Sequence, residues 1–148
     1  MNHNLNKEEK AYLYELLYKF EYGSRAGYQD DKLDTMIADV AINDNYKKKD
    51  NIAAAPDNSL HFTPYYNNKC WAILYHVRNA FAHGNIESVD NDKMFLIKDY
   101  SDRKNRQVCN MYAKIEKEKF YRLINAIEKS KEISSKKRQK NNSKMKKS

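Results

Sequence analysis

The chain has 148 residues and a mass of 17.6 kDa, which is the size of one domain or of one domain with a tail. Charged residues make up 32% of it, the mean hydropathy is −1.01, and no run approaches the roughly 20 apolar residues of a membrane helix, so membrane proteins are excluded. The N-terminus has no apolar stretch typical of a secretory signal, and two cysteines are too few for a disulfide scaffold. A reduced, cytoplasmic protein is expected.

The net charge of +8 comes almost entirely from the C-terminus. Seven of the 28 Lys and Arg residues lie within residues 134–148, which contain no acid, so the rest of the chain carries 21 bases against 20 acids. Such a segment is typical of a disordered tail, and we place a domain at residues 1–133 and the tail at 134–148. The tail is either merely solvated or binds nucleic acid through its charge, with Lys136, Lys137 and Arg138 as the candidate contacts.

Two helices are predicted in the first part of the chain. The first is capped by Asn4 or Asn6 and ends near Gly23, and Asp30 with Asp31 is a plausible cap for the second. Apolar residues recur at helical spacing in both. They are Leu13, Leu16, Leu17 and Phe20 in the first helix, and Leu33, Met36, Ile37, Val40 and Ala41 in the second.

A long loop separates these helices from a third one. From about residue 43 to residue 67 the periodicity is lost and both prolines of the chain occur. Loops of this length are usually functional or mobile. The third helix is predicted from residue 67 to residue 83, because Gly84 is a standard residue at the end of a helix.

The last part of the chain is predicted to hold a hairpin and a fourth helix. Residues 87–99 and 106–112 look extended, and residues 101–105 make the turn between them. The fourth helix is predicted from residue 113 to residue 133. With only three Gly and two Pro in the chain, helices are favoured over a sheet with many tight turns.

The third helix separates apolar from polar residues. At about 100° per residue, one stripe faces the core and consists of Cys70, Leu74, Val77 and Phe81. The polar side faces away from the core of its own domain. It carries Arg78, Asn79, Ala82 and His83, with Tyr75 and His76 nearby.

The polar side has the residue types of a phosphodiester-cleaving site. His83 can take and give a proton near neutral pH, and Arg78 offers a planar charged fork for phosphate oxygens. Asn79 stands four residues before His83 on the same face, where it can orient the ring or bind phosphate. A proton shuttle beside a guanidinium is a minimal site for cleavage without metal. Taken alone, these residues favour a solvated face with a capping His over a catalytic site.

The ten residues from Tyr75 to Gly84 read YHVRNAFAHG. This string resembles the signature of the HEPN superfamily (higher eukaryotes and prokaryotes nucleotide-binding), which is Arg, a polar residue, three residues and His, often followed by Gly. Arg78 through Gly84 matches the signature completely. The order of the predicted elements is similar to that of small prokaryotic HEPN proteins. The resemblance implies an all-α, HEPN-like helical bundle with an inserted β-hairpin before the last helix.

The resemblance also implies an activity. HEPN proteins of this kind are metal-independent ribonucleases that act as toxins or in antiviral defence, and they use no cofactor. Two HEPN domains pair so that two Arg/His sets share one cleft, which implies a homodimer here. RNA is the implied substrate, and an antitoxin or a defence-system protein is the further partner that the resemblance suggests. By position, His83 is the acid and base, Arg78 the phosphate clamp and Asn79 the orienting residue. The expected products carry 2′,3′-cyclic phosphate ends.

Neighbouring residues complete the expected site. Tyr75 and His76 are expected to contact RNA. Asn85 departs from the pattern of those HEPN toxins that carry, two residues after the His, a Tyr that a partner nucleotidyltransferase modifies. No metal site is expected, because His76 and His83 lie two turns, or roughly 10 Å, apart along the helix.

Two alternatives remain open at this point. The first is a non-catalytic HEPN module that binds nucleotide, RNA or a protein partner. The second is a helical scaffold or regulatory protein in which Arg78 and His83 merely support a dimer.

Overall fold

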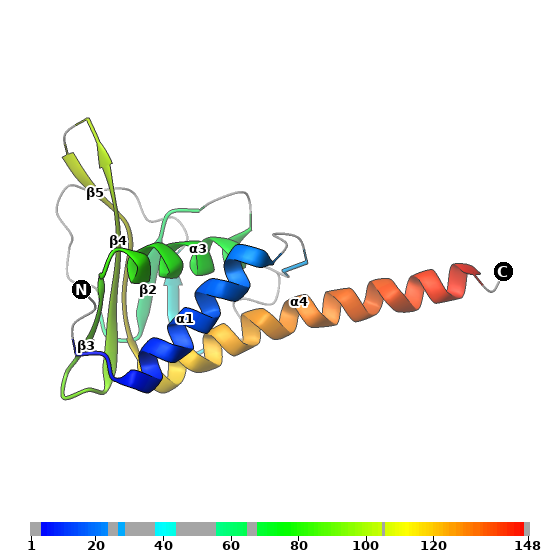
Figure 1. Ribbon diagram of the computed structural model, residues 1–148, viewed down its shortest axis with the longest axis horizontal. Coiled ribbons are helices and arrows are strands. Elements are labelled where there is room, and N and C mark those ends of the chain that lie inside the picture. Colours follow the sequence, from blue (N-terminus) through cyan, green and yellow to red (C-terminus); the bar gives the residue numbers. More distant parts are fainter. Residues whose placement is uncertain are drawn as a thin grey trace.

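The computed structural model describes residues 4–23, 27–28, 38–43, 56–64, 68–104 and 106–146. Figure 1 shows the described chain as a sheet with helices packed on it. The helices are α1 (Lys7–Tyr22), α3 (Lys69–Ala82) and α4 (Lys117–Lys146). The strands are β1 (Ala41–Asn43), β2 (Ser59–Phe62), β3 (Ile86–Val89), β4 (Met94–Arg103) and β5 (Arg106–Glu116).

The strands form one five-stranded sheet, so the expectation of an all-α bundle is wrong. Their order is β1-β2-β5-β4-β3, with β1 parallel to β2 and every other pair antiparallel. The predicted hairpin exists as β4–β5, but it forms the centre of a mixed sheet and is not an insertion in a helical bundle. The other three strands have three or four residues each, which is too short for an alternating pattern to stand out in the sequence.

Two turns divide the predicted hairpin region into the strands β3, β4 and β5. The segment expected to be extended from residue 87 to residue 99 is broken between β3 and β4 by Asp90, Asn91 and Asp92, whose φ angles are 53°, 56° and 64°. Asp and Asn tolerate this left-handed region better than other residues with a side chain. The second turn is confirmed, because Arg103 pairs with Arg106 at the end of the β4–β5 ladder.

Several predicted element boundaries also need correction. Ala41 begins strand β1 and does not belong to a helix, whereas Asp30, Asp31 and most of the predicted second helix lie outside the described residues. Residues 113–116 end strand β5, so the last helix begins at Lys117 and not at residue 113.

The last helix runs on to Lys146, through residues for which the sequence predicted disorder (Figure 1). Residues 134–146 contain neither Gly nor Pro, and eight of these thirteen residues are Lys, Arg, Gln or Met, which are good helix formers. They continue a helix that already exists, so no new nucleus has to form. The division of the chain into a domain at 1–133 and a tail at 134–148 stays a prediction.

The core lies between the helices and one face of the sheet. Along β4, the buried residues Ile97 and Asp99 alternate with half-buried neighbours, the pattern of a sheet covered on one face. The predicted core stripe of α3 is confirmed, and all four of its members are 6% exposed or less. Among the described residues, no helix is long and apolar enough to cross a bilayer.

We expect the variant Leu74→Ala to lower the free energy of unfolding by roughly 2–5 kcal/mol, because Leu74 is 2% exposed within the core and its truncation leaves a cavity. Urea denaturation measures the change. The matched control is Lys10→Ala on the exposed side of α1, which should change stability by no more than about 0.5 kcal/mol. Equal stability of the two variants would contradict this packing.

Candidate active site

Helix α3 carries the predicted site residues, and both of its ends are well defined. At the start, the side chain of Asn68 accepts a hydrogen bond of 2.9 Å from the backbone N–H of Trp71. At the end, His83 is the capping residue, and the N–H of Asn85 donates back to the carbonyl of Ala80 at 2.7 Å. Gly84 has a φ of 74°, which a residue without a side chain adopts at little cost. This ending fixes the position of His83 beyond the last turn.

The polar side of α3 forms one wall of a cavity of about 880 Å³. The five residues that the sequence analysis singled out on this helix all line it, so the structure brings them together. They are Tyr75, His76, Arg78, Asn79 and His83. The opposite wall comes from the end of β2 and from the β4–β5 hairpin, which the sequence analysis did not connect with the site.

Arg78 is held by two neighbours. Its Nε donates a hydrogen bond of 2.6 Å to Oε1 of Glu21 from α1, and its Nη2 forms an ion pair with the same oxygen. Its Nη1 donates to Oδ1 of Asn79 at 2.8 Å. The side chain is still 33% exposed, so the guanidinium is oriented but remains accessible to a ligand in the cavity.

Asn79 therefore acts on Arg78 in this structure, whereas the sequence analysis left open whether it orients His83 or binds phosphate. Its carbonyl oxygen fixes the plane of the guanidinium from one side while Glu21 fixes it from the other. His83 itself is exposed, and no partner of its ring is recorded among the described residues. The site thus presents the oriented guanidinium of Arg78 and the exposed imidazole of His83.

His76 is buried, and both of its ring nitrogens are engaged. The ring is 2% exposed, its Nδ1 lies 2.6 Å from Oδ2 of Asp99 on β4, and its Nε2 lies 2.9 Å from the backbone carbonyl of Thr63 after β2. From the sequence, His76 is expected to contact RNA, which stays a prediction. The structure shows that its ring joins α3 to β4 and to the chain that follows β2.

The geometry of His76 fixes the number of protons in this cluster. A carbonyl oxygen only accepts, so Nε2 carries a hydrogen that it donates to Thr63. The 2.6 Å contact between Nδ1 and Asp99 also requires a proton between the two atoms. The pair is therefore an imidazolium with a carboxylate, or an imidazole with a carboxyl group. In either form both nitrogens are satisfied, as burial at this depth requires.

Strand β5 contains a β-bulge at Asn110. In the β4–β5 ladder Asp99 pairs with Met111 and Tyr100 with Cys109, which leaves Asn110 as the extra residue on β5. The bulge lies directly beside Asp99, the partner of His76. Nothing in the sequence marks this position, because a bulge results from a mismatch of register between two strands.

Comparison with known families identifies the chain. A family model described as HEPN pEK499 p136 matches residues 11–141. The chain belongs to this HEPN family. The match covers nearly all of the described fold and confirms the resemblance seen in the motif on α3. No curated protein and no solved structure matches the chain. Membership indicates a nuclease-like module or one with a role in toxin or defence systems.

The remaining candidates lie apart from the HEPN motif or outside the described side chains. Cys70 and Cys109 are both buried, and Sγ of Cys109 lies 3.1 Å from the carbonyl of Met111. Among the described residues, no group of three His, Cys, Asp or Glu is placed to hold a metal ion. The side chains of the basic candidates lie outside the description. These are Lys136, Lys137 and Arg138.

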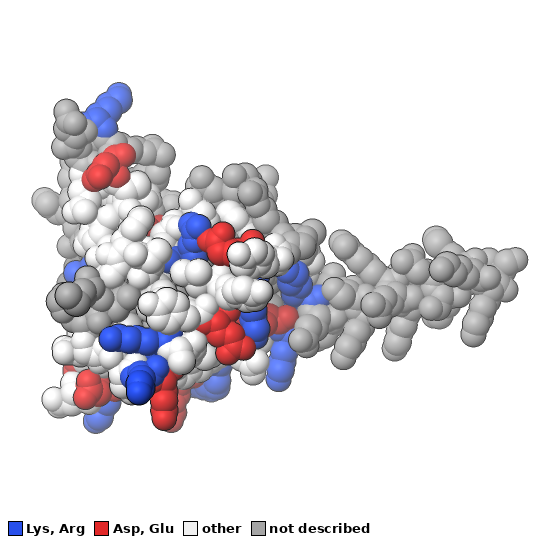
Figure 2. Space-filling model, in the orientation of Figure 1, with Lys and Arg blue, Asp and Glu red and all other residues white. Residues whose placement is uncertain are grey.

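One face of the described chain is mixed in charge. Figure 2 shows Lys and Arg interspersed with Asp and Glu over the body of this face, with no continuous basic area among the described residues. This agrees with the nearly neutral balance of residues 1–133. Attraction of a phosphate to the HEPN cavity therefore depends on individual groups such as Arg78.

We expect Asp99→Leu to lower the free energy of unfolding by about 3–5 kcal/mol, because it leaves the buried His76 without its partner. The double variant with His76→Leu removes both members of the pair and should cost less than the sum of the two single changes. A double-mutant cycle in urea measures the coupling. Strict additivity would show that the two side chains do not interact.

Proposed function

We propose that this HEPN protein is a metal-independent endoribonuclease that acts as a homodimer, in a toxin or antiviral defence system. The observation that carries the proposal is that Arg78, Asn79 and His83 of the HEPN motif line one cavity. The guanidinium is oriented and accessible, and the imidazole is exposed beside it. These are a phosphate clamp and a proton carrier, which is what cleavage of RNA by its own 2′-hydroxyl requires.

The reaction balances without a metal or a cofactor. His83 removes the proton of a ribose 2′-hydroxyl, and the oxygen attacks the adjacent phosphorus. The bond from phosphorus to the 5′-oxygen breaks, and a protonated imidazole returns a proton to that oxygen. The products are a 2′,3′-cyclic phosphate and a 5′-hydroxyl. Arg78 stabilises the negative charge that accumulates on the phosphate oxygens in between.

The homodimer follows from the need for two proton carriers in one step. A base and an acid act on opposite sides of the phosphorus, and the described part of one chain offers one exposed His beside the guanidinium. A two-fold axis near the end of α3 would bring the same patch from both subunits together. Ala82 is exposed and small on this face, so a second α3 can approach closely.

The ion pair between Arg78 and Glu21 also favours a second candidate function. Because Glu21 already neutralises the guanidinium, Arg78 has a structural partner that joins α1 to α3. In a non-catalytic HEPN module, which binds RNA, nucleotide or a protein partner, the ion pair of Arg78 with Glu21 would stay intact. RNA cleavage and the consequences of removing Glu21 distinguish the two candidates.

We expect the purified protein to cleave single-stranded RNA in EDTA and to leave 2′,3′-cyclic phosphate ends. Arg78→Ala and His83→Ala should each lower the rate at least ~10²-fold, the scale of losing one acid, base or charge-stabilising donor. Both side chains are outside the core, so thermal unfolding should change little. An RNA with 2′-deoxyribose at the cleavage site is the matched substrate control and should resist. Cleavage that needs Mg²⁺ would contradict the mechanism.

Mixing of variant subunits tests the composite site. Arg78→Ala and His83→Ala homodimers should each be inactive. An excess of His83→Ala subunits should also abolish the activity of added wild-type protein if the subunits exchange and share a cleft, because a mixed dimer holds only one of the two proton carriers. Sedimentation of the wild-type protein should show a dimer. A fully active monomer would rule out the shared site while leaving RNA cleavage intact.

We expect Glu21→Gln to strengthen RNA binding several-fold, because it removes the carboxylate that competes with phosphate for Arg78. Binding of an RNA carrying one 2′-deoxynucleotide at the cleavage site, measured at several salt concentrations, gives the affinity without cleavage. Glu15→Gln is the matched control, since Glu15 lies on α1 and pairs with Lys19. Weaker binding by Glu21→Gln than by the control would favour the purely structural pair.

A further inference from the structure

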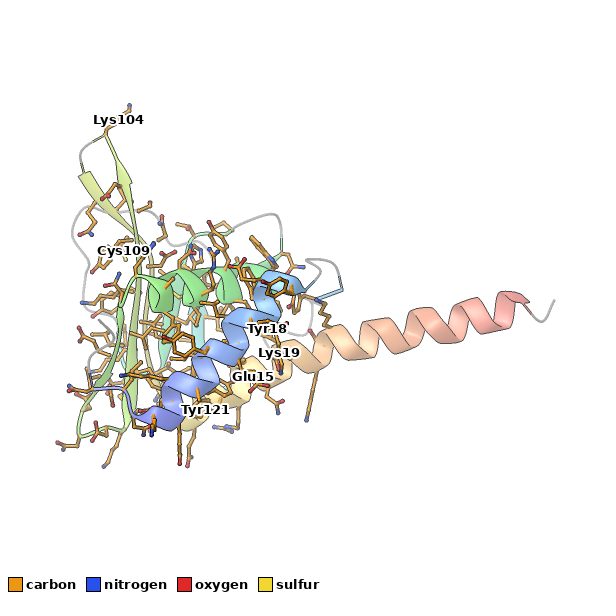
Figure 3. The ribbon with its side chains drawn as sticks, viewed as in Figure 1. Glu15, Tyr18, Lys19, Lys104, Cys109 and Tyr121 are labelled. Carbon is orange, nitrogen blue, oxygen red and sulfur yellow. The ribbon has the colours of Figure 1, made fainter. Side chains whose placement is uncertain are left out.

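The cavity offers more space than the proposed chemistry uses. Its volume of about 880 Å³ is in the range of pockets that enclose whole small molecules. The phosphate clamp and the proton carrier occupy only the wall formed by α3. The opposite wall, formed by the β4–β5 hairpin, is therefore free to contact the part of the substrate that lies next to the phosphate. Figure 3 marks Lys104 at the tip of this hairpin and Cys109 further toward the body.

The two walls differ in charge. The wall on α3 holds the guanidinium of Arg78 and the imidazole of His83. Among the described side chains of β4 and β5 that line the cavity, none is Lys or Arg, and the side chains of Arg103 and Arg106 lie outside the description. The lining residues are Asp99, Tyr100, Ser101, Asp102, Gln107 and Asn110. These side chains suit a neutral group rich in hydrogen-bond donors and acceptors.

Asn110 is the most informative residue of the hairpin wall. It is the extra residue of the β-bulge, so neither a facing residue on β4 nor the regular ladder determines its environment. Its backbone carbonyl accepts a hydrogen bond of 2.9 Å from the N–H of Thr63, which anchors it to the chain after β2. Its Nδ2 donates to Oγ of Ser101 at 2.9 Å. The backbone of Asn110 is thus anchored to the chain after β2, and its side-chain amide is oriented by Ser101.

The amide oxygen of Asn110 lacks a partner. The residue is 8% exposed, and Oδ1 is buried without any hydrogen bond, which makes it the one such side-chain atom found among the described residues. An unpaired buried acceptor costs about 1–3 kcal/mol relative to a paired one. A ligand that brings an N–H group to this atom would recover that free energy.

We propose that the hairpin wall binds an RNA base next to the scissile phosphate, and that Asn110 accepts a hydrogen bond from the amino group of that base. This proposal rests on the proposed function for its choice of RNA as ligand. Adenine, guanine and cytosine carry an exocyclic amino group, and uracil does not. The amide of Asn is a common partner of such amino groups, especially that of adenine. The protein therefore discriminates against uridine at this position.

The first test changes the substrate and leaves the protein untouched. The test compares short RNAs that differ in one nucleotide only. This nucleotide is placed first on one side of the cleavage site and then on the other. Replacing adenosine by purine riboside, or guanosine by inosine, deletes the amino group alone. At one of the two positions, kcat/KM should fall roughly tenfold, the scale of one base-specific hydrogen-bonding contact, and uridine should also be poor. Equal cleavage of all these RNAs at both positions would overturn the proposal.

The second test removes the protein's side of the contact. The variants Asn110→Ala and Ser101→Ala should cleave the RNA with purine riboside and the RNA with adenosine with equal kcat/KM. The tenfold preference of the wild-type protein should therefore disappear. Lys98→Ala is the matched control on the same hairpin, because its amine lies over the ring of Tyr112 and the residue does not line the cavity. The control should keep the preference. Retention of the preference by Asn110→Ala would also overturn the proposal.

A binding assay separates this proposal from the proposed function. If the protein cleaves no RNA, the same pairs of bases are compared by equilibrium binding of RNAs that carry 2′-deoxyribose at the central nucleotide. Tighter binding of adenosine than of purine riboside, lost in Asn110→Ala, supports the base contact even though the catalytic proposal fails. If the protein cleaves RNA without any base preference, the catalytic proposal stands and the base contact fails. Absence of preference in both assays overturns the base contact.

Discussion

The position of the HEPN motif depends on the buried contact of His76 with Asp99 and Thr63. One ring joins α3 to β4 and to the chain that leaves β2, and the Thr63 N–H in turn binds Asn110 on β5. Four elements thus meet within two residues of Arg78. The ring of His76 donates a hydrogen bond to the carbonyl of Thr63 and shares a proton with the carboxyl group of Asp99. A rotation of α3 would therefore leave all three buried groups unpaired. This penalty holds the polar side of the helix toward the cavity.

The sequence predicted the helix of the site well and the sheet poorly. The expected helix from residue 67 to residue 83 agrees with α3 and its caps, because a complete apolar stripe, a capping Asn68 and Gly84 are all local signals. Strands β1 and β2 owe their structure to pairing with distant residues, such as Leu60 with Ala113, and have no local signal of similar strength. Propensity and periodicity do not record such pairing.

The site shows the same division between local and distant information. Arg78, Asn79 and His83 lie within six residues, so one helix presents them and the motif reveals them. Glu21, Asp99 and Asn110 come from three other elements, and none belongs to a pattern. His76 is the motif neighbour whose environment the sequence does not reveal. Helical periodicity places it near the polar side, but only the tertiary structure shows an acceptor at each ring nitrogen.

The two carboxylates near the motif have opposite consequences for function. Asp99 is buried with His76, and its charge or proton is matched inside the protein, so it contributes to the framework and leaves the cavity nearly unaffected. Glu21 is 38% exposed and contacts the guanidinium from solvent, where water screens the pair and a phosphate can replace it. A phosphate that displaces Glu21 finds Arg78 still held by Asn79. Under the proposed function, Glu21 neutralises the guanidinium in the free protein and Asn79 already orients it for RNA. Binding would then require the exchange of one anion for another and little movement of the helix.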